Sequence, residues 1–392
     1  MRLNVGLFND SFPPTIDGVA NAVFNYAKII SEKFGDVVVA TPKYPDVVDD
    51  YNFEVFRYGS IPVIGPLPYR AGNPFSPSAI KYLRSKKFDI IHVHSPFASS
   101  VLVKLITNKP AYKVPVVLTY HTKFDFDIAK YIKLPLMQNI AKKFVLYNIN
   151  QANEVWVVSK GAGENLRSLG YKGDYLVMPN GTDFEKGKAP KDEIEKLRQK
   201  HGILECQKVM LFVGRMMWYK NVKLLLDSLD LVKKANIDFK AIFVGEGTDR
   251  ADIEKYAQKI GLKDFTVFTG AIRDRNLVRA YFSLADLFLF PSTYDTSGLV
   301  VKEAAACECP SLLIKGSCAA EDVQDGFTGL LAEETAESCG EKIISALKND
   351  EFLKTLGKNA SEYVYTSWND AVSKAYDRYQ LILEKWDAGN RK

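Results

Sequence analysis

Residues 284–314, LADLFLFPSTYDTSGLVVKEAAACECPSLLI, predict a strand, a loop, a helix and a second strand in succession. The apolar run from Leu284 to Phe290 has the length and aromatic content of a buried strand, and Pro291 ends it. A helical pattern begins at Gly298 and ends at Pro310, before a second short apolar run. This order of elements is typical of a sheet whose strands are joined by helices.

The placement of carboxylates in this unit is unusual. Glu303 shares a helical face with Leu299, because residues four apart stack on a helix. Asp295 lies eight residues before Glu303, in the loop that leads to the helix. Free N–H groups at a helix N-terminus attract phosphate, and carboxylates bind hydroxyl groups. From the residues alone, a structural interpretation stays open, in which Asp295 caps the helix and Glu303 complements its dipole.

The unit resembles the nucleotide-sugar signature of GT4-type retaining glycosyltransferases, in which two acidic residues are separated by seven others. The residues that carry the resemblance are Pro291-Ser292, Asp295, Ser297-Gly298-Leu299 and Glu303-Ala304. Most of that family has Glu at the first acidic position, so Asp295 is shorter by one methylene. The resemblance implies that the donor is contacted by Asp295, Ser297, Gly298, Leu299 and Glu303, with Glu303 on the ribose.

Length and composition bound the architecture. The 392 residues, 47% of them hydrophobic, exceed what one hydrophobic core usually holds, so two domains are expected. Charged residues make up 25%, and there is no low-complexity tract, which favours a folded chain. No apolar run approaches the roughly 20 residues that span a bilayer, and the N-terminus lacks a signal-peptide cleavage pattern. We expect a cytoplasmic protein, either free or peripheral at the inner face of the membrane.

The positive charge is concentrated in the N-terminal half. Residues 1–185 hold 21 Lys and Arg against 16 acidic residues, whereas residues 186–392 hold 31 of each. Within residues 51–150 the count is 14 basic to 4 acidic, a local excess of ten. Such a cluster attracts anionic surfaces such as lipid head groups or nucleic acid. Of these, an anionic membrane surface is the expected partner, and no nucleic acid is expected. A solvated basic face is the alternative interpretation.

The cysteines do not predict a disulfide framework. Their number is odd and all five fall in the C-terminal half: Cys206, Cys307, Cys309, Cys318 and Cys339. Reduced thiols are the favoured interpretation. A zinc site is the competing one, but Cys307-x-Cys309 lacks the usual two-residue gap and no histidine lies near it. No metal and no cofactor are expected.

The N-terminal half predicts a parallel sheet with helices on both faces. The expected strands are residues 3–8, 37–40, 90–93, 116–118 and 155–158. After the first strand, the loop NDSFPPTIDG leads to Gly18, where backbone can approach a ligand closely, although a plain turn fits as well. In the resembled family the corresponding loop touches donor diphosphate and acceptor. Gly18 matches as a donor contact, and Asp17, an acceptor contact here, replaces a second glycine.

His121 follows the strand 116–118, at the end of a strand where open α/β sheets bind ligands. A histidine satisfied locally at the start of a loop is the alternative. In the resembled family the matching histidine lies near the transferred sugar, which implies a catalytic role for His121 and acceptor contacts for Tyr120 and Lys123. The stretch TYHTKFDFDIAKYI also resembles bacterial diacylglycerol glucosyltransferases. His92 and His94 share one face of a strand, but no third metal ligand is evident.

From Leu134 to Ile149 the apolar residues recur at helical spacing, with Lys142 and Lys143 toward one side. This mixture is typical of an interfacial helix. Core packing beside a solvated lysine face explains it equally well, so both interpretations stay open.

The second half begins with an expected strand, residues 209–213, followed by GRMMWYKN. Arg215 and Lys220 lie in this loop, where two cations would neutralise a diphosphate leaving group, as a divalent metal does in other transferases. A plain surface loop is the alternative for either cation alone. Further along, Ile272 matches a position where, in the resembled family, the backbone meets the nucleotide base.

The resemblance covers nearly the whole chain and implies the GT-B fold, two doubly wound α/β Rossmann-like domains facing across a cleft. The expected domains are residues 1–185, which bind the acceptor, and 186–371, which bind the nucleotide sugar, with a terminal helix of about residues 372–392 packing back on the first. The expected function is retaining transfer of a hexose, with UDP-glucose or a similar donor, to a hydroxyl of a membrane lipid such as diacylglycerol. The alternatives are a sugar or cell-surface polysaccharide acceptor, a nucleotide-sugar epimerase and a degenerate binding module.

Overall fold

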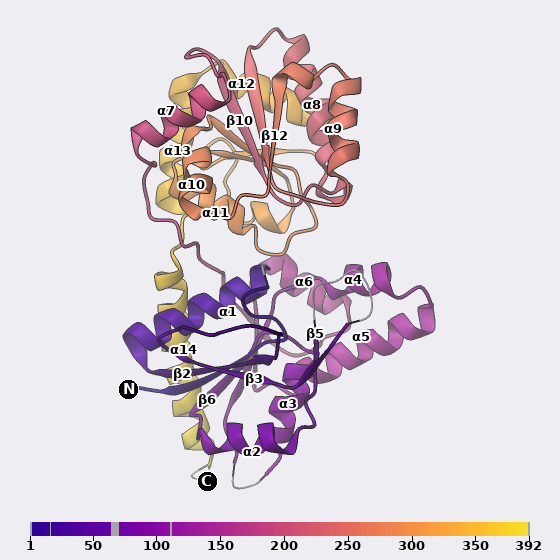
Figure 1. The fold of residues 1–392 in the computed structure, drawn as a ribbon, viewed down its shortest axis with the longest axis vertical. Helices are drawn as coiled ribbons and strands as arrows, with labels where there is room; N and C mark the ends of the chain where they lie inside the picture. Colours follow the sequence, from indigo (N-terminus) through magenta and orange to yellow (C-terminus); the bar gives the residue numbers. More distant parts are fainter. Residues whose placement is uncertain (1, 16, 64–69, 110–111, 391–392) are drawn as a thin grey trace. The chain divides into compact units, whose positions relative to one another are not determined.

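The computed structural model describes residues 2–15, 17–63, 70–109 and 112–390, and it divides into two compact units, each built around a parallel sheet (Figure 1). Unit 1 comprises the chain up to Asn180 together with the segment from Trp368 onward, and unit 2 comprises Gly181–Ser367. The boundaries expected at 185/186 and 371/372 lie a few residues further along the chain. The prediction of two doubly wound α/β domains is confirmed.

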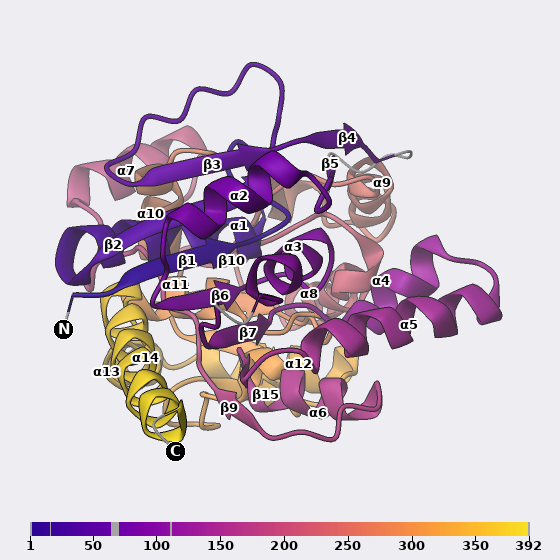
Figure 2. The ribbon, with the colours of Figure 1, turned by 90° about the horizontal axis from the view of Figure 1, so that it is seen from below.

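Unit 1 contains a seven-stranded sheet in the order β3-β2-β1-β6-β7-β8-β9, and all of its neighbours are parallel. Figure 2 shows β3, β2, β1, β6 and β7 in this order. Because β1 lies between β2 and β6, the strand order reverses there, and ligands bind beside such a point in open α/β sheets. The strands are β1 (Asn4–Phe8), β2 (Asp36–Pro42), β3 (Glu54–Tyr58), β6 (Ile90–Val93), β7 (Val116–Tyr120), β8 (Glu154–Val157) and β9 (Tyr175–Val177), with a separate antiparallel pair, β4 (Ser60–Pro62) and β5 (Arg70–Gly72).

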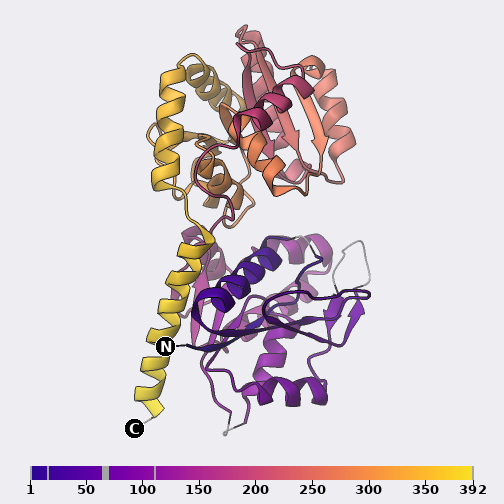
Figure 3. The same cartoon turned by 60° about the vertical axis from the view of Figure 1, so that its left-hand side comes forward.

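Helices cover both faces of this sheet, and Figure 1 shows α1 and α2 on opposite sides of it. The helices of unit 1 are α1 (Gly18–Ile29), α2 (Pro77–Ser85), α3 (Ala98–Thr107), α4 (Phe124–Tyr131), α5 (Pro135–Ile149), α6 (Lys160–Ser168) and α14 (Trp368–Asn390), with a π-helical turn at Ile30–Phe34. The terminal helix α14 lies beside α1 (Figure 3). The Tyr376 hydroxyl accepts the Leu3 N–H at 2.9 Å and donates to the Phe34 carbonyl at 3.0 Å, which fastens α14 to unit 1.

Unit 2 contains a six-stranded parallel sheet in the order β12-β11-β10-β13-β14-β15. Its strands are β10 (Lys208–Val213), β11 (Phe239–Val244), β12 (Thr266–Gly270), β13 (Leu287–Phe290), β14 (Ser311–Ile314) and β15 (Leu330–Ala332). Its helices are α7 (Lys191–Lys200), α8 (Val222–Lys234), α9 (Arg250–Lys259), α10 (Arg275–Leu284), α11 (Leu299–Ala306), α12 (Ala336–Leu347) and α13 (Asp350–Tyr363), with 3₁₀ turns at Trp218–Lys220, Lys263–Phe265 and Cys318–Ala320.

The signature unit forms as predicted, with one correction at its start. The strand expected from Leu284 begins at Leu287, because Leu284 is the last residue of α10. Both Leu284 and Leu287 are buried, so an apolar run alone did not locate the boundary between helix and strand. The short strands β3, β9 and β15 were not predicted, and most of the residues in β3 and β9 are only partly buried.

Candidate active site

The loop between β13 and α11 turns into the helix at Gly298, which has a left-handed backbone with φ of 56°. A Cβ atom built there would lie 2.8 Å from the Ala319 Cβ, so an L residue is disfavoured both by conformation and by space. No side-chain hydrogen bond caps α11 among the described residues. The first N–H groups of this eight-residue helix, beginning at Leu299, are therefore available to an anionic ligand.

Lys220 and Asp295, 75 residues apart in sequence, form a direct ion pair. The Lys220 Nζ donates to the Asp295 Oδ1 at 2.6 Å, and Lys220 is only 5% exposed. Burial lowers the pKa of the Lys220 ammonium, and the charge and hydrogen bond of Asp295 partly offset that decrease. Asp295 therefore pairs with a buried cation and does not cap α11, so the capping interpretation is wrong.

The same loop holds polar atoms that lack a protein partner. Among the described residues, the Asp295 Oδ2, Ser297 Oγ and Ser292 Oγ are buried without a hydrogen bond. Buried polar atoms are satisfied in the great majority of cases, and leaving one unpaired costs about 1–3 kcal/mol. Three such atoms in one loop mark a place where a polar ligand or water would complete the bonding.

Arg215 lies in the loop that follows β10, and its side chain is exposed. The Arg215 Cζ is 5.8 Å from the centroid of the Tyr219 ring, and the Lys220 Nζ is 5.5 Å from the same ring. Tyr294, from the signature loop, places its ring 4.8 Å from that of Tyr219. The structure thus gathers both predicted cations and the signature loop around one aromatic pair.

Gly245 and Gly247, in the loop after β11, allow that loop to pack against the loop after β10. A Cβ at Gly245 would lie 1.9 Å from the Gly214 carbonyl oxygen, and a Cβ at Gly247 would lie 2.3 Å from that of Met216. The backbones are joined by hydrogen bonds, including Met216 N–H to the Glu246 carbonyl at 3.0 Å. This close approach of the two backbones fixes the position of the loop that carries Arg215 and Lys220.

Glu303, on α11, is buried with 8% of its surface exposed, and it pairs with a residue that was not predicted. The Arg275 Nη2 donates to the Glu303 Oε1 at 2.7 Å and to the Asp183 Oδ1 at 2.5 Å, while the Arg275 Nε donates to the Asp183 Oδ2 at 3.0 Å. Burial raises the pKa of Glu303, and the guanidinium opposes that increase. Arg275 therefore favours the ionised form of a carboxylate expected to bind ribose. Arg275 is the first residue of α10, and no feature of the sequence predicted its role at this site.

Ile272, another of the predicted donor contacts in unit 2, follows β12 by two residues. Its partly buried side chain packs against the core of unit 2. This packing fixes the backbone of the segment, which is the part expected to meet a base. Leu299 begins α11 and is partly buried.

In unit 1, His121 belongs to a buried histidine cluster. The His94 Nδ1 lies 3.0 Å from the His121 Nε2, and His92 bonds the Tyr379 hydroxyl at 2.5 Å and the Thr119 hydroxyl at 2.7 Å. Burial lowers the pKa of His121 to about 3 and lowers those of His92 and His94 well below the usual value. All three imidazoles are therefore neutral near pH 7, so His121 can exchange hydrogen bonds but does not supply a positive charge.

Asp17 caps α1. Its Oδ1 accepts the Val19 N–H at 2.9 Å and the Ala20 N–H at 2.7 Å, and Gly18 is the first residue of the helix. The Asp17 Oδ2 is buried without a hydrogen bond among the described residues. Asp17 thus has a local structural role, and one of its oxygens stays available to a ligand.

The two other predicted acceptor contacts differ in exposure. Tyr120 is completely buried, and its hydroxyl donates to the Asn165 Oδ1 at 2.7 Å. Because this side chain packs in the core of unit 1, the structure does not favour the predicted acceptor contact through Tyr120. Lys123 directly precedes α4 and is partly exposed.

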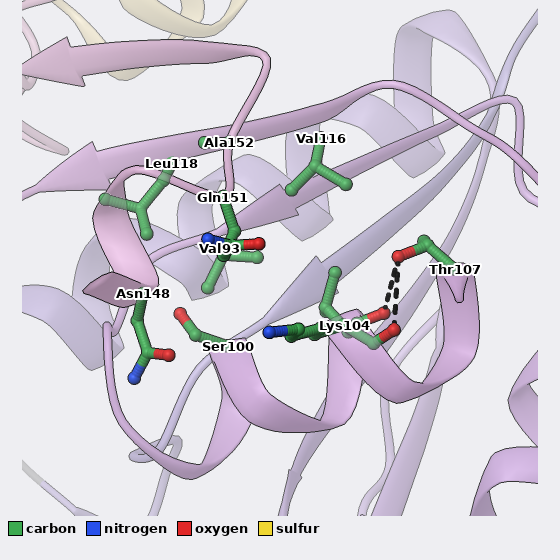
Figure 4. Close-up of a pocket in the computed structure, with 10 residues that line it drawn as sticks. Val93, Ser100, Lys104, Thr107, Val116, Leu118, Asn148, Gln151 and Ala152 are labelled. Atoms are coloured by element: carbon green, nitrogen blue, oxygen red, sulfur yellow. Dashed lines mark hydrogen bonds between the residues drawn. The ribbon is translucent and has the colours of Figure 1, made fainter. Parts of the chain in front are cut away.

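A small cavity in unit 1 contains none of the predicted site residues (Figure 4). Its volume is about 70 Å³, and it lies between β6, β7, α3 and α5. That volume admits a few water molecules, whereas sites for drug-sized ligands measure roughly 300–1,000 Å³. The lining residues are Val93, Ser100, Val103, Lys104, Thr107, Val116, Leu118, Asn148, Gln151 and Ala152.

The cysteines and histidines do not assemble a metal centre in the part of the chain that is described. All five cysteines are free thiols, and four of them are buried. Over residues 2–15, 17–63, 70–109 and 112–390, no group of three or more His, Cys, Asp or Glu side chains is placed to hold a metal ion. Within the same ranges, no helix has the length and apolar character required to cross a bilayer.

Comparison with known proteins gives a family match for each half of the chain. Residues 16–186 match the model of Glycosyltransferase Family 4, and residues 193–363 match the model of Glycosyl transferases group 1. An alpha-monoglucosyldiacylglycerol synthase of Acholeplasma laidlawii is 25% identical over 402 residues, covering 100% of this chain and 99% of the relative. A protein of the same description from Streptococcus pneumoniae is 26% identical over 313 residues, covering 79% of this chain and 70% of the relative.

The fold is likewise similar to solved structures. Anabaena Alr3699/HepE in complex with UDP-glucose superposes with a TM-score of 0.75 at 18% identity, and the match covers 98% of this chain and 100% of that one. The expected GT-B class, with two Rossmann-like domains, is confirmed. With a family 4 domain followed by a group 1 domain, the chain belongs to the GT4-type glycosyltransferases of the GT-B fold.

Proposed function

We propose that this glycosyltransferase moves glucose from UDP-glucose to a hydroxyl group of a membrane lipid such as diacylglycerol, with retention of the anomeric configuration and without a metal ion. The single observation that carries the donor part is the arrangement around Asp295 in unit 2. There, a buried lysine is paired with one carboxylate oxygen, while the other oxygen and the Ser297 hydroxyl lack partners among the described residues.

The residues of unit 2 suit the two chemical parts of a nucleoside diphosphate. Arg215 and Lys220 supply positive charge for the diphosphate, and the uncapped start of α11 adds N–H donors. Glu303, whose ionised form is favoured by the Arg275 guanidinium, accepts hydrogen bonds from ribose hydroxyls. The similar Anabaena structure is a complex with UDP-glucose, which supports the choice of nucleotide and sugar.

In the proposed reaction, the bond between the sugar C1 and the diphosphate oxygen breaks, and UDP departs with its developing charge neutralised by Arg215 and Lys220. The acceptor oxygen then bonds to C1 on the face that UDP leaves, and the hydroxyl proton passes to a departing phosphate oxygen. Cations aimed at the leaving group supply the stabilisation that a divalent metal supplies elsewhere. Neutral His121 contributes hydrogen bonding, because its pKa of about 3 keeps it uncharged near pH 7.

The lipid acceptor is supported by the names of the two relatives, both alpha-monoglucosyldiacylglycerol synthases, and by the excess of ten basic residues within residues 51–150. Part of that block, residues 64–69 and 110–111, lies outside the described residues. Basic segments of this kind are attracted to anionic leaflets.

A panel of nucleotide sugars tests the proposal, each incubated with the full-length protein, anionic vesicles containing diacylglycerol, and EDTA. We expect nucleotide release from UDP-glucose above the other donors, coupled to glycolipid formation and insensitive to EDTA. Release of UDP with no labelled lipid would overturn the acceptor and favour a soluble sugar or polysaccharide instead. Loss of activity in EDTA, restored by a divalent ion, would overturn the metal-independent step.

A further inference from the structure

The helix α5 exposes a row of large apolar side chains. Leu136, Met137, Ile140, Phe144 and Tyr147, which we call the α5 stripe, are each between 44% and 72% exposed. Leu134, just before the helix, is 66% exposed. Single exposed apolar residues are ordinary on a protein surface, but several on one helix require an explanation.

The α5 stripe lies on one face of the helix. At 100° per residue, residues 136, 140, 144 and 147 fall within about 80° of one another, and residue 137 adjoins them. The buried residues Val145 and Ile149 fall on the opposite side. A surface helix ordinarily turns its apolar face to the core, whereas α5 has a small buried face and a larger apolar face toward solvent.

The surroundings of the α5 stripe are positively charged. The helix contains no acidic residue, and the exposed Lys133 precedes it. Lys143, also exposed, falls about 20° from Leu136 at the edge of the stripe, whereas Lys142 falls about 20° from Ile149 on the opposite face. Lys104, from α3, places its Nζ 4.3 Å from the centroid of the Tyr147 ring. An apolar face with Lys143 at its edge and Lys104 against its Tyr147 ring matches a helix that lies in the plane of a membrane interface.

The arrangement of unit 1 leaves this face accessible within the unit. α5 packs against α4 and α3, and in Figures 1 and 2 the α4–α5 pair extends outward from the strands of unit 1. Only Val145, Asn148 and Ile149, near the C-terminal end of α5, are buried. The first two turns of the helix therefore present apolar surface that the described residues of unit 1 do not bury.

We propose that the α5 stripe docks on an anionic lipid bilayer, with its apolar side chains at the boundary between headgroups and acyl chains and its lysines against lipid phosphates. The partner follows from charge, because a second copy of this chain would bring the same lysines face to face, whereas an anionic leaflet complements them. This inference rests on the proposed lipid acceptor, since docking would bring the enzyme to the surface that holds diacylglycerol.

The test uses the full-length I140Q/F144Q variant, in which glutamine keeps helix propensity while removing apolar surface. Its matched control is L204Q/L381Q, because Leu204 and Leu381 are 61% and 46% exposed, close to the 51% and 44% of Ile140 and Phe144. A charge reversal of two exposed lysines beside the stripe, K133E/K143E, is compared with K354E/K358E, whose exposed lysines lie on α13 in unit 2. Vesicle sedimentation is measured without donor, on phosphatidylcholine vesicles with and without anionic phosphatidylglycerol.

We expect I140Q/F144Q to weaken binding to anionic vesicles at least tenfold and K133E/K143E to weaken it only when the anionic lipid is present, while both controls bind as the wild type does. Transfer to a short-chain diacylglycerol dispersed in water should be unchanged in I140Q/F144Q, whereas transfer to vesicle diacylglycerol should fall. Equal vesicle binding by this variant and the wild type would overturn the proposal. So would a wild-type dimer in sedimentation velocity that I140Q/F144Q converts to a monomer, with no vesicle binding by either.

Failure of the proposed function gives a different result. If the wild type binds anionic vesicles through the α5 stripe but glycosylates no diacylglycerol in either form, the docking surface is supported and the acceptor is wrong. If the wild type glycosylates vesicle diacylglycerol and I140Q/F144Q does so equally well, the acceptor is supported and the docking surface is wrong.

Discussion

Replacing Arg275 by methionine tests whether this guanidinium favours the ionised form of Glu303. In the structure, one guanidinium bonds both Glu303 and Asp183, at 2.7 Å and 2.5 Å through the same nitrogen. Methionine retains part of the aliphatic stem, but it removes the charge, the hydrogen bonds to Glu303 and Asp183, and the guanidinium carbon that lies 4.4 Å from the centroid of the Phe184 ring. Glu303 stays buried after the change, and burial raises its pKa further once the guanidinium no longer opposes that increase.

The size of the effect follows from the exposure of the pair. A hydrogen bond to a charged group contributes about 1.5–3 kcal/mol, and the Arg275 side chain is 44% exposed, so solvent screening places the expected loss near the lower value. A loss of about 1.5 kcal/mol corresponds to about a tenfold increase in KM for the nucleotide sugar, with kcat changed much less. The protonated acid form of Glu303 is the weaker acceptor for ribose hydroxyls, so the increase should be larger at pH 6 than at pH 8.

Steady-state kinetics of R275M against pH measure this prediction. R273M is the matched control, because Arg273 is an exposed arginine two residues away, and R275K should recover part of the affinity by restoring the charge. Thermal denaturation checks that each variant is folded. A KM for donor that equals the wild-type value at both pH values, in folded R275M, would refute the role assigned to Arg275.

Three further substitutions have expected outcomes. K220M should lower kcat by about 100-fold or more, because a cation at the leaving group is lost, and a near-normal kcat would contradict that role. G298A should lower the free energy of unfolding by about 1–3 kcal/mol, measured in urea, because its backbone is left-handed and its Cβ would lie 2.8 Å from that of Ala319; an unchanged midpoint would contradict this reasoning. Y379F should lower stability by about 1 kcal/mol, because His92 loses a buried hydrogen bond, and full stability would show that the bond contributes nothing net.

Local patterns in the sequence predicted most of the fold and the chemistry of the donor site. The apolar run, the loop with Gly298 and the helix ended by Pro310 each carry their signal within a few residues, and the structure has them in that order. Strands with weaker signals were missed, such as β9, whose three residues are all partly buried.

Contacts between distant residues could not be predicted in the same way. The pairing of Lys220 with Asp295 joins segments 75 residues apart, and that of Arg275 with Glu303 joins segments 28 apart, so each depends on the packed sheet. The sequence pattern of α5 fits either a buried or an interfacial helix, because periodicity reports that an apolar face exists but not which way it points. The structure shows which face of α5 packs, because Val145 and Ile149 are buried opposite the exposed α5 stripe.

Incorporation of labelled glucose into lipid is a direct test of the proposed transfer to diacylglycerol. The full-length protein is incubated with UDP-glucose labelled in the sugar and with anionic vesicles containing diacylglycerol, and the lipid extract is analysed for product. We expect one labelled glycolipid, α-linked as in the donor, formed only when diacylglycerol is present. Release of UDP with all of the label left in the aqueous phase would contradict the proposed transfer.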